Sequence, residues 1–324
     1  MNVLITGRLP DRVLADIEAT SKVVQNRADR PMDREAILQQ IDGKDGLLCM
    51  ITDTVDSELL DRAPGLKIIA NYGVGFNNID VAAATRRGIL VTNTPGVLTD
   101  ATADITFALL LAAGRRVVAG DRYTREGRFR FWAPFHFLGS EISGKTLGIV
   151  GMGRIGQAVA RRAIGFNMTL LYSSRQRLPV ETERALNATH VNLEALLARS
   201  DFVSLHVPLT EQTHHLIDAA ALNRMRPEAF LINTSRGPVV DEAALCTALQ
   251  NRTIAGAGLD VYEHEPAVTS GLLVLDNVVL LPHAGSATIE TRTKMARMAA
   301  DNLLAGLADQ KPPNCLNWDT LYDK

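Results

Sequence analysis

Residues 146–175, TLGIVGMGRIGQAVARRAIGFNMTLLYSSR, decide the fold of this chain. They begin with the short apolar run LGIV, which is typical of a buried parallel strand. Gly151, Gly153 and Gly156 follow in G-x-G-x-x-G spacing and lead into a segment with helical apolar periodicity. A second apolar run, 168–172, completes a β-α-β unit.

The glycines of such a turn have separate functions. The first permits a tight turn, the second lets the backbone approach a pyrophosphate, and the third allows close packing of the helix on the strand. The start of the helix also offers N–H groups and the positive end of its dipole to an anion. A glycine-rich turn without a ligand is the alternative. The strand before the turn, the helix after it, and a second strand ending about 20 positions later favour a dinucleotide site.

Residues at the end of the second strand predict which dinucleotide is bound. NAD enzymes usually carry an acid there, which bonds the ribose 2′-hydroxyl. This chain has Ser173, Ser174 and Arg175, followed shortly by Arg177. Hydroxyls and a guanidinium suit a 2′-phosphate, which an acid would repel. We therefore expect NADP(H) to be preferred, with Arg175 as the main phosphate contact and NAD(H) still possible. An ordinary solvated arginine is the alternative.

The composition excludes several classes of protein. With 324 residues, 46% of them hydrophobic, the chain can build about two domains with separate cores. The net charge of −2, without long runs of one sign, argues against a nucleic-acid or membrane-surface partner. No apolar run approaches the ~18 residues that span a bilayer, and the first residues lack the basic region of a signal peptide. The 3 widely separated cysteines indicate free thiols in a reducing compartment, so we expect a cytoplasmic protein without a metal site.

The first 99 residues alternate apolar runs with helix-like segments. This alternation predicts an open, doubly wound parallel sheet. Ligands bind such sheets beyond the carboxyl ends of the strands, where we place the loop 71–75. Its glycines could expose backbone N–H groups to a carboxylate, although a tight turn explains them equally well. The expected strands are residues 3–6, 22–25, 46–52, 66–72 and 89–93, and the expected helices are 11–20, 33–41, 56–63 and 80–87.

Two segments in the middle of the chain have an unusual composition. Residues 102–113 are apolar on nearly all sides, which predicts a helix buried all round where the chain crosses between domains. Residues 123–137 hold six aromatic side chains and three arginines without a helical or strand period. Because aromatic residues and arginine are favoured in interfaces, we expect an arm across a homodimer contact. A loop packed on its own domain is the alternative.

Beyond residue 175 the alternation resumes, and polar groups follow the strand-like runs. If these strands are parallel to the first one, their polar groups gather at the sheet edge that carries the glycine loop. A helix is expected at 289–307, and Lys311-Pro312-Pro313 is expected to end regular structure. The strand-like runs are 202–207, 229–234, 255–260 and 277–281, and the polar groups are His206, Thr234, Ser235, Arg236, Asp260 and His283.

Some of these side chains suit hydride transfer to a 2-oxo acid. The reaction needs a cation for the substrate carboxylate, a proton donor for the carbonyl oxygen, and a scaffold that aligns both with a nicotinamide. Arg236 offers a fork that fits a carboxylate, and His283 is the best proton donor. Glu265 could orient that imidazole and favour its charged form, and Asp260 could contact the nicotinamide amide. A surface arginine and a histidine satisfied by backbone are the alternatives. The other histidines lack metal-ligand spacing and are taken as structural.

Several blocks of this sequence, in this order, are typical of one family of enzymes: NYGVGFNNID, TNTPGVLTDATAD, GKTLGIVGMGRIG, HVPLTEQTHHLI, INTSRGPVVDE, GAGLDVYEHEP and LLPHAGSAT. On these blocks the chain is similar, nearly end to end, to the D-isomer-specific 2-hydroxyacid dehydrogenases, and most closely resembles their glyoxylate/hydroxypyruvate reductase branch. The resemblance implies that Arg236 binds the substrate carboxylate, and that His283 is the general acid/base with Glu265 as its partner. It further implies that the backbone of Val74 and Gly75 completes the carboxylate clamp.

The resemblance also implies an architecture and a set of cofactor contacts. It predicts two doubly wound α/β domains, with a Rossmann cofactor domain (100–285) inserted into a discontinuous flavodoxin-like substrate domain (1–99 and 286–324). Family members are usually homodimers built around the cofactor domain. The cofactor contacts that we expect are Thr102, Gly151, Gly153, Arg154, Ile155, Gly156, Ser173, Ser174, Arg175, His206, Pro208, Thr213, Thr234, Ser235, Asp260 and Gly285.

The predicted function is NADPH-dependent reduction of glyoxylate or hydroxypyruvate to the D-2-hydroxy acid. A dehydrogenase for another oxo acid, such as 2-ketogluconate, is the alternative among enzymes. A non-enzymatic, cofactor-sensing scaffold can share the fold, but such proteins usually carry long disordered extensions, and no biased stretch is visible here. Turnover distinguishes the two classes, because a scaffold would bind NADPH without reducing any oxo acid.

Overall fold

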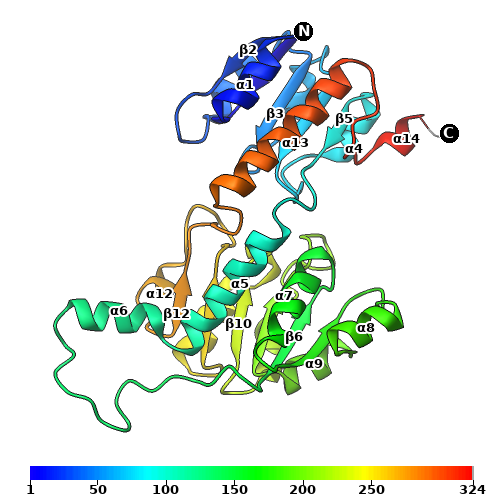
Figure 1. The fold of residues 1–324 in the computed structure, drawn as a ribbon. Coiled ribbons are helices and arrows are strands. Elements are labelled where there is room, and N and C mark those ends of the chain that lie inside the picture. The colour runs from blue at the N-terminus through cyan, green and yellow to red at the C-terminus, as the bar shows by residue number, and fades with distance from the viewer. Residues whose placement is uncertain (323–324) are drawn as a thin grey trace. The chain divides into compact units, whose positions relative to one another are not determined.

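Two parallel sheets organise the residues that the structure describes, one in each of two units (Figure 1). In this computed structural model, which describes residues 1–322, the smaller unit comprises Met1–Leu98 and the residues from Thr288 onward. The larger unit is Thr99–Ala287. Residues 323 and 324 of the predicted C-terminal segment lie outside the described residues. The identification of the units as substrate and cofactor domains, with bounds after residues 99 and 285, stays a prediction.

The smaller unit has an open sheet in the order β2-β1-β3-β4-β5, and its strands are all parallel. This is the flavodoxin-like order, in which the chain changes direction across the sheet between β1 and β3. The predicted doubly wound sheet is therefore confirmed. Its strands are β1 (Asn2–Ile5), β2 (Lys22–Gln25), β3 (Gly46–Met50), β4 (Ile68–Tyr72) and β5 (Leu90–Thr92).

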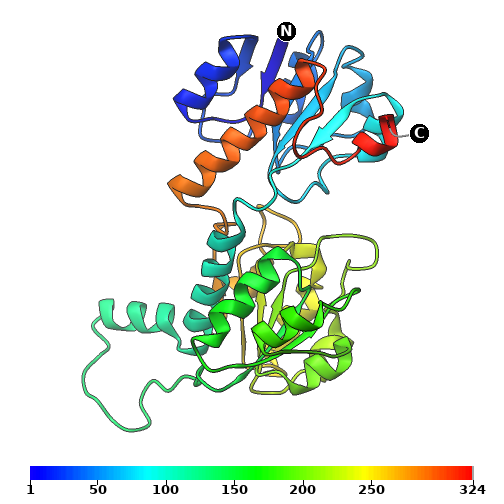
Figure 2. The same cartoon turned by 45° about the vertical axis from the view of Figure 1, so that its right-hand side comes forward.

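Side chains that alternate along these strands build a core on each face of the sheet. Leu4, Leu47 and Ile69 stand in register on neighbouring strands and belong to one core cluster, because every second side chain points to the same face. Helices α2, α3 and α4 cover this face, and α1 and α13 cover the other (Figure 2). The bounds are α1 (Asp11–Glu18), α2 (Arg34–Gln40), α3 (Ser57–Asp61), α4 (Val81–Arg86) and α13 (Ile289–Leu307).

The C-terminal segment corrects one expectation. Helix α13 spans the predicted residues, but Lys311-Pro312-Pro313 does not end regular structure, since α14 (Trp318–Tyr322) follows. Trp318 and Leu321 pack against the core on the α13 face. The apolar side chains beyond the prolines pack against this core, and the contact stabilises a helix although the prolines locally disfavour one.

The larger unit holds a parallel sheet in the order β12-β11-β10-β9-β6-β7-β8. This is the Rossmann order extended by β12, and the topological switch lies between β6 and β9. Strand β8 was not predicted, because its sequence, Ala188-Thr189-His190, contains no run of apolar residues. The bounds are β6 (Thr146–Val150), β7 (Thr169–Ser173), β8 (Ala188–His190), β9 (Phe202–Leu205), β10 (Phe230–Asn233), β11 (Gly256–Leu259) and β12 (Val278–Leu280).

Helices cover both faces of this sheet as well. One core cluster includes side chains of α5, α7 and α8, and the other includes side chains of α9, α10, α11 and α12. The prediction that residues 102–113 are buried all round is wrong for the chain by itself, because Asp104 and Ala108 of α5 are exposed. The bounds are α5 (Thr99–Gly114), α7 (Arg154–Ile164), α8 (Val180–Leu186), α9 (Leu193–Arg199), α10 (Ala219–Arg224), α11 (Glu242–Gln250) and α12 (Ser270–Leu273). Among the described helices, none combines the length and apolar character that a membrane span requires.

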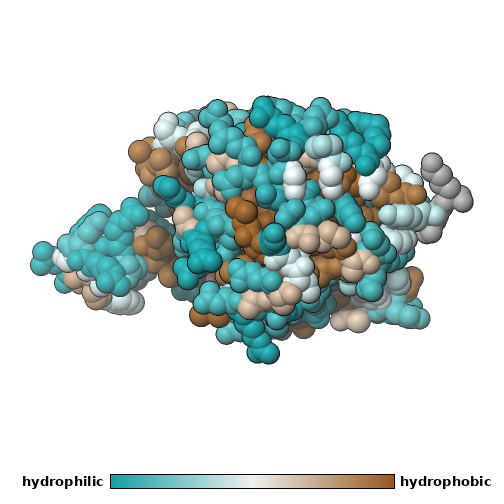
Figure 3. Space-filling view, turned by 90° about the horizontal axis from the view of Figure 1, so that it is seen from above, coloured by the Kyte–Doolittle hydropathy of each residue, from teal (hydrophilic) through white to brown (hydrophobic). Residues whose placement is uncertain are grey.

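The predicted arm projects from the rest of the larger unit. Helix α6 (Val117–Arg125) and the chain after it extend away from the sheet in Figures 1 and 2, and hydrophobic residues lie beside hydrophilic ones on this projection in Figure 3. Its base is held by the Tyr123 hydroxyl, which bonds His136 Nε2 at 3.1 Å, and by the Arg128 guanidinium over the Tyr123 ring. Its exposed aromatic side chains are Phe129, Phe131, Trp132 and Phe135.

Candidate active site

The glycine loop after β6 has a different environment at each glycine. Gly151 has φ +94°, and a Cβ there would lie 2.6 Å from the His206 carbonyl oxygen. A Cβ on Gly156 would lie 2.2 Å from the Gly151 carbonyl oxygen. A Cβ on Gly153 would meet nothing within 4 Å. Gly151 therefore makes the turn, Gly153 leaves an open face, and Gly156 lets the helix pack closely on the strand. A dinucleotide-binding loop requires these three functions.

The open face at Gly153 coincides with the start of α7. The first N–H groups of a helix have no acceptor within the helix, and no side chain caps this one. Because Arg154, Ile155 and Gly156 form its first turn, their N–H groups and the helix dipole suit a phosphate. The residues present therefore fit the pyrophosphate of a dinucleotide.

The end of β7 carries the groups expected at a ribose 2′ position. Ser173 and Ser174 are partly exposed and Arg175 is exposed. Arg177 is already engaged, because its Nε and Nη2 bond the two carboxylate oxygens of Glu183 at 2.8 Å. Hydrogen bonds from this guanidinium and from a tyrosine hydroxyl hold the pKa of Glu183 at about 2. Arg175 is thus the arginine of this pair that is available to a ligand.

Further predicted cofactor residues line the carboxyl ends of the same strands. The Thr102 hydroxyl donates to the Gly285 carbonyl at 3.3 Å, which ties α5 to the loop after β12. The Thr213 hydroxyl donates to the Pro208 carbonyl at 2.6 Å and closes the loop after β9. His206 precedes that loop, and desolvation lowers its pKa to about 3, so the imidazole is neutral. Thr234 and Ser235, directly after β10, complete the set.

The predicted acid/base pair is assembled. His283 Nδ1 lies 2.8 Å from Glu265 Oε2, and the other carboxylate oxygen accepts the Tyr262 N–H at 3.0 Å. Burial by itself would raise the pKa of Glu265, but the His283 bond, the Tyr262 N–H and the charge of Arg236 outweigh it, so the pKa is lowered. The carboxylate is ionised at neutral pH and leaves Nε2 as the imidazole nitrogen that can face a substrate. His283 also has φ +53°, in the left-handed region that few non-glycine residues adopt.

Asp260 fixes the loop that carries the histidine. Its carboxylate oxygens accept the N–H groups of Ala284 at 2.6 Å and Gly285 at 2.7 Å, and the His283 N–H bonds its carbonyl. Burial raises the pKa of this carboxyl group, although the two N–H bonds oppose the rise, and the residue is 1% exposed. The observed contacts of Asp260 therefore position His283, and its contact with a nicotinamide amide stays a prediction.

Arg236 lies close enough to Glu265 for their charges to interact. Burial lowers the pKa of the guanidinium, and the carboxylate opposes this effect. Gly237, which the sequence analysis missed, makes the approach of the two loops possible. A Cβ at this position would lie 1.8 Å from the Tyr262 carbonyl carbon, so only glycine allows the backbones to cross. A lone glycine after a strand gave no sequence signal for a partner 25 residues away.

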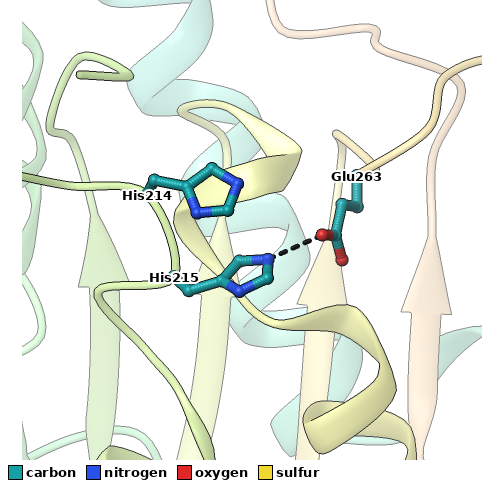
Figure 4. A group of neighbouring side chains, drawn as sticks. All are labelled: His214, His215 and Glu263. Carbon is teal, nitrogen blue, oxygen red and sulfur yellow. Dashed lines mark hydrogen bonds and ion pairs between the residues drawn. The ribbon is translucent and has the colours of Figure 1, made fainter. Parts of the chain in front are cut away.

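A second histidine–glutamate pair lies on the neighbouring loop (Figure 4). His215 Nε2 lies 2.6 Å from Glu263 Oε1, and the His214 ring stacks on the His215 ring at 4.0 Å between centroids, with 28° between planes. A metal binds imidazole in the plane of the ring, and nearly parallel stacked rings do not aim their lone pairs at one point. The geometry of this cluster of the described residues is that of a hydrogen-bonded histidine–glutamate pair with a second imidazole stacked on it. The expectation that no metal is bound stays a prediction.

Val74 and Gly75 belong to the smaller unit, in the loop that follows β4. The Val74 carbonyl accepts the Asn93 side-chain amide at 2.8 Å, and the Gly75 carbonyl accepts that of Asn71 at 2.8 Å. The predicted substrate groups are thus backbone groups in a loop held by side-chain amides.

Comparisons with known proteins show the family to which the chain is similar. The family model described as "D-isomer specific 2-hydroxyacid dehydrogenase, NAD binding domain" matches residues 107–285. The chain is 51% identical over 323 residues to a glyoxylate reductase of Thermococcus litoralis, covering 98% of this chain and 97% of that protein. A crystal structure of a Thermus thermophilus protein superposes with a TM-score of 0.91 at 46% identity, covering 98% of this chain and 100% of that chain. The crystal structure of an NADPH-dependent glyoxylate/hydroxypyruvate reductase of Sinorhizobium meliloti, in complex with NADP and malonate, superposes with a TM-score of 0.87 at 36% sequence identity. This match covers 97% of this chain and 96% of that chain.

Substitutions at two of the glycines should affect different properties, one NADPH binding and the other stability. Gly153→Val should leave the free energy of unfolding nearly unchanged and weaken NADPH binding about tenfold or more, because its side chain fills the open phosphate face. Gly156→Ala should lower the free energy of unfolding by ~1–3 kcal/mol, because its Cβ meets backbone. Urea unfolding and calorimetric titration measure both quantities. A Gly153→Val protein that binds NADPH as tightly as the wild type would contradict the assignment.

Proposed function

Because this chain belongs to the D-isomer-specific 2-hydroxyacid dehydrogenase family, we propose that it uses NADPH to reduce glyoxylate or hydroxypyruvate to the D-2-hydroxy acid. The observation that carries the proposal is the 2.8 Å pair of His283 and Glu265 beside Arg236, on the sheet edge that also carries the glycine loop. Relatives named glyoxylate reductase at about half identity support the choice of substrate.

The chemistry assigned to the chain's own residues is a proton transfer with charge stabilisation. When bound, NADPH supplies a hydride for the carbonyl carbon of the substrate. His283 donates a proton from Nε2 to the carbonyl oxygen, and Glu265 holds Nδ1 and stabilises the protonated ring beforehand. Arg236 binds the substrate carboxylate, and its low exposure strengthens that attraction. The backbone N–H groups of Val74 and Gly75 are assigned to the same carboxylate.

The preference for NADPH rests on charge at the end of β7. The adenosine 2′-phosphate would meet Ser173, Ser174 and Arg175, while Glu183 is neutralised by Arg177. A solved relative that is NADPH-dependent supports this assignment.

Removal of the proposed proton donor gives the first test. His283→Ala should lower kcat by roughly 10²–10⁴, the usual contribution of general acid catalysis, without weakening NADPH binding. Arg236→Ala should raise KM for the oxo acid most strongly.

His264→Ala is the matched control for these variants. His264 is an exposed histidine on the same loop as Glu265, and its removal should leave turnover near that of the wild type. Steady-state assays with glyoxylate measure these values, and unchanged efficiency in His283→Ala or Arg236→Ala removes that residue from the mechanism.

Cofactor choice is tested at Arg175. Arg175→Ala should raise KM for NADPH about tenfold and change KM for NADH little, because only the phosphorylated cofactor loses a charged hydrogen bond. Arg184→Ala removes the same charge from an exposed position nearby and serves as the control. Equal losses with both cofactors would refute the 2′-phosphate contact, as would a wild-type enzyme that prefers NADH.

We also propose a homodimer formed through the arm. Large aromatic side chains that stay in water favour association, and Trp132 and Phe135 are 80% and 88% exposed. A cavity of about 680 Å³ between the arm and the sheet offers a second copy both apolar surface, at Val118 and Phe137, and charged surface, at Arg122 and Glu126.

Sedimentation equilibrium tests the arm. The wild type should have twice the 35.2 kDa mass of one chain, and Phe135→Asp should shift the protein toward the single-chain mass. Val24→Asp, an exposed position in the smaller unit, should leave the mass unchanged. A wild type that sediments as a single chain at working concentration would contradict the proposal.

A further inference from the structure

Three consecutive carbonyl groups in the loop after β4 each accept a hydrogen bond. The Gly73 carbonyl accepts the Thr94 N–H at 3.0 Å, and the Val74 carbonyl accepts Asn93 Nδ2 at 2.8 Å. Asn71 Nδ2 bonds the Gly75 carbonyl at 2.8 Å and approaches the Gly73 carbonyl at 3.4 Å. Two side-chain amides and one backbone amide therefore set the orientation of three successive peptide groups.

This orientation determines where the N–H groups point. In a trans peptide the C=O and the following N–H point in opposite directions. Because the carbonyls of residues 73, 74 and 75 face the amides, the N–H groups of Val74, Gly75 and Phe76 face away from them. Within the described residues, none of these three N–H groups donates to an acceptor. Successive backbone N–H groups of this kind can serve as donors to an anion.

The amides that hold the loop are themselves fixed and buried. Asn71 is 0% exposed, and its Oδ1 accepts Asn78 Nδ2 at 3.4 Å. Asn93 is 7% exposed, and its carbonyl accepts Asn302 Nδ2, from α13, at 3.1 Å. The bond from Asn78 limits the rotation of the Asn71 side chain, and the bond from Asn302 fixes the backbone that carries Asn93. An exposed turn would not need two buried amides to fix its peptide planes.

We propose that Asn71 and Asn93 are positioning residues for the substrate carboxylate: they align the N–H groups of Val74, Gly75 and Phe76 as its donors. This inference rests on the proposed function, which places a 2-oxo acid in this enzyme. The stretch 71–77, NYGVGFN, contains no cationic side chain. Carboxylate binding by this loop therefore depends on the direction of its N–H groups. If one of these peptide groups rotates, the loop loses a hydrogen-bond donor, and no charged side chain of the loop replaces it.

The test measures carboxylate binding apart from turnover. Oxamate, a 2-oxo acid analogue that is not reduced, is titrated by calorimetry into the full chain saturated with NADPH, and glyoxylate kinetics are recorded in parallel. Asn71→Ala and Asn93→Ala should each weaken oxamate binding about tenfold, the order expected when aligned hydrogen bonds are lost. KM for glyoxylate should rise by a similar factor, kcat should change less than about threefold, and the NADPH affinity should stay unchanged.

Asn317→Ala is the matched control. Asn317 is 3% exposed in the same unit, and its side chain bonds the Ile89 carbonyl and the Val91 N–H, away from the loop. This variant should lose stability to a similar degree and bind oxamate within about twofold of the wild type. Should Asn71→Ala fail to fold, Asn71→Ser, whose shorter hydroxyl does not reach the carbonyls, takes its place.

The outcomes separate this inference from the proposed function. If the asparagine variants of the loop bind oxamate as tightly as Asn317→Ala, the inference is overturned and the proposed function is untouched. If the wild type binds oxamate and reduces no 2-oxo acid, the proposed function fails, and a selective loss of oxamate binding in the loop variants still supports the positioning role. A wild type that does not bind oxamate overturns the inference.

Discussion

The parallel direction of the strands in the larger unit is the constraint on which its site depends. Parallel strands bring all their carboxyl ends to one edge, so residues far apart in the chain become neighbours there. The glycine loop follows β6 at the topological switch, while Arg236 follows β10 and His283 follows β12. Reversal of any one of these strands would carry its functional group to the opposite edge. The order and direction of the strands therefore determine which side chains can meet at this edge.

Burial gives these gathered groups their electrostatic character. Desolvation opposes charge on Arg236 and Glu265, and their mutual attraction and the bond to His283 offset that cost. For Asp260, the N–H groups of Ala284 and Gly285 oppose the cost of desolvation, and the same bonds fix the loop that carries His283. A carboxylate with such partners keeps both its charge and its geometry, which suits the role proposed for Glu265 beside His283.

Much of this organisation could be predicted from the sequence, because its signals are local. The β-α-β unit, the strand-end position of His283 and the bounds of α13 follow from periodicity and spacing within short windows. The contact of Gly237 with Tyr262 and the amides of Asn71 and Asn93 could not be predicted, since each depends on a partner brought near only by the fold. Strand β8 and helix α14 were missed because short elements owe their existence to packing.

The central claim is that this strand edge reduces a 2-oxo acid at a defined face. Incubation of the enzyme with hydroxypyruvate and NADPH, followed by chiral analysis of the product, tests it most directly. D-glycerate is expected in an amount equal to the NADPH consumed. Formation of L-glycerate would contradict it, as would the absence of NADPH consumption with glyoxylate, hydroxypyruvate, pyruvate and 2-ketogluconate alike.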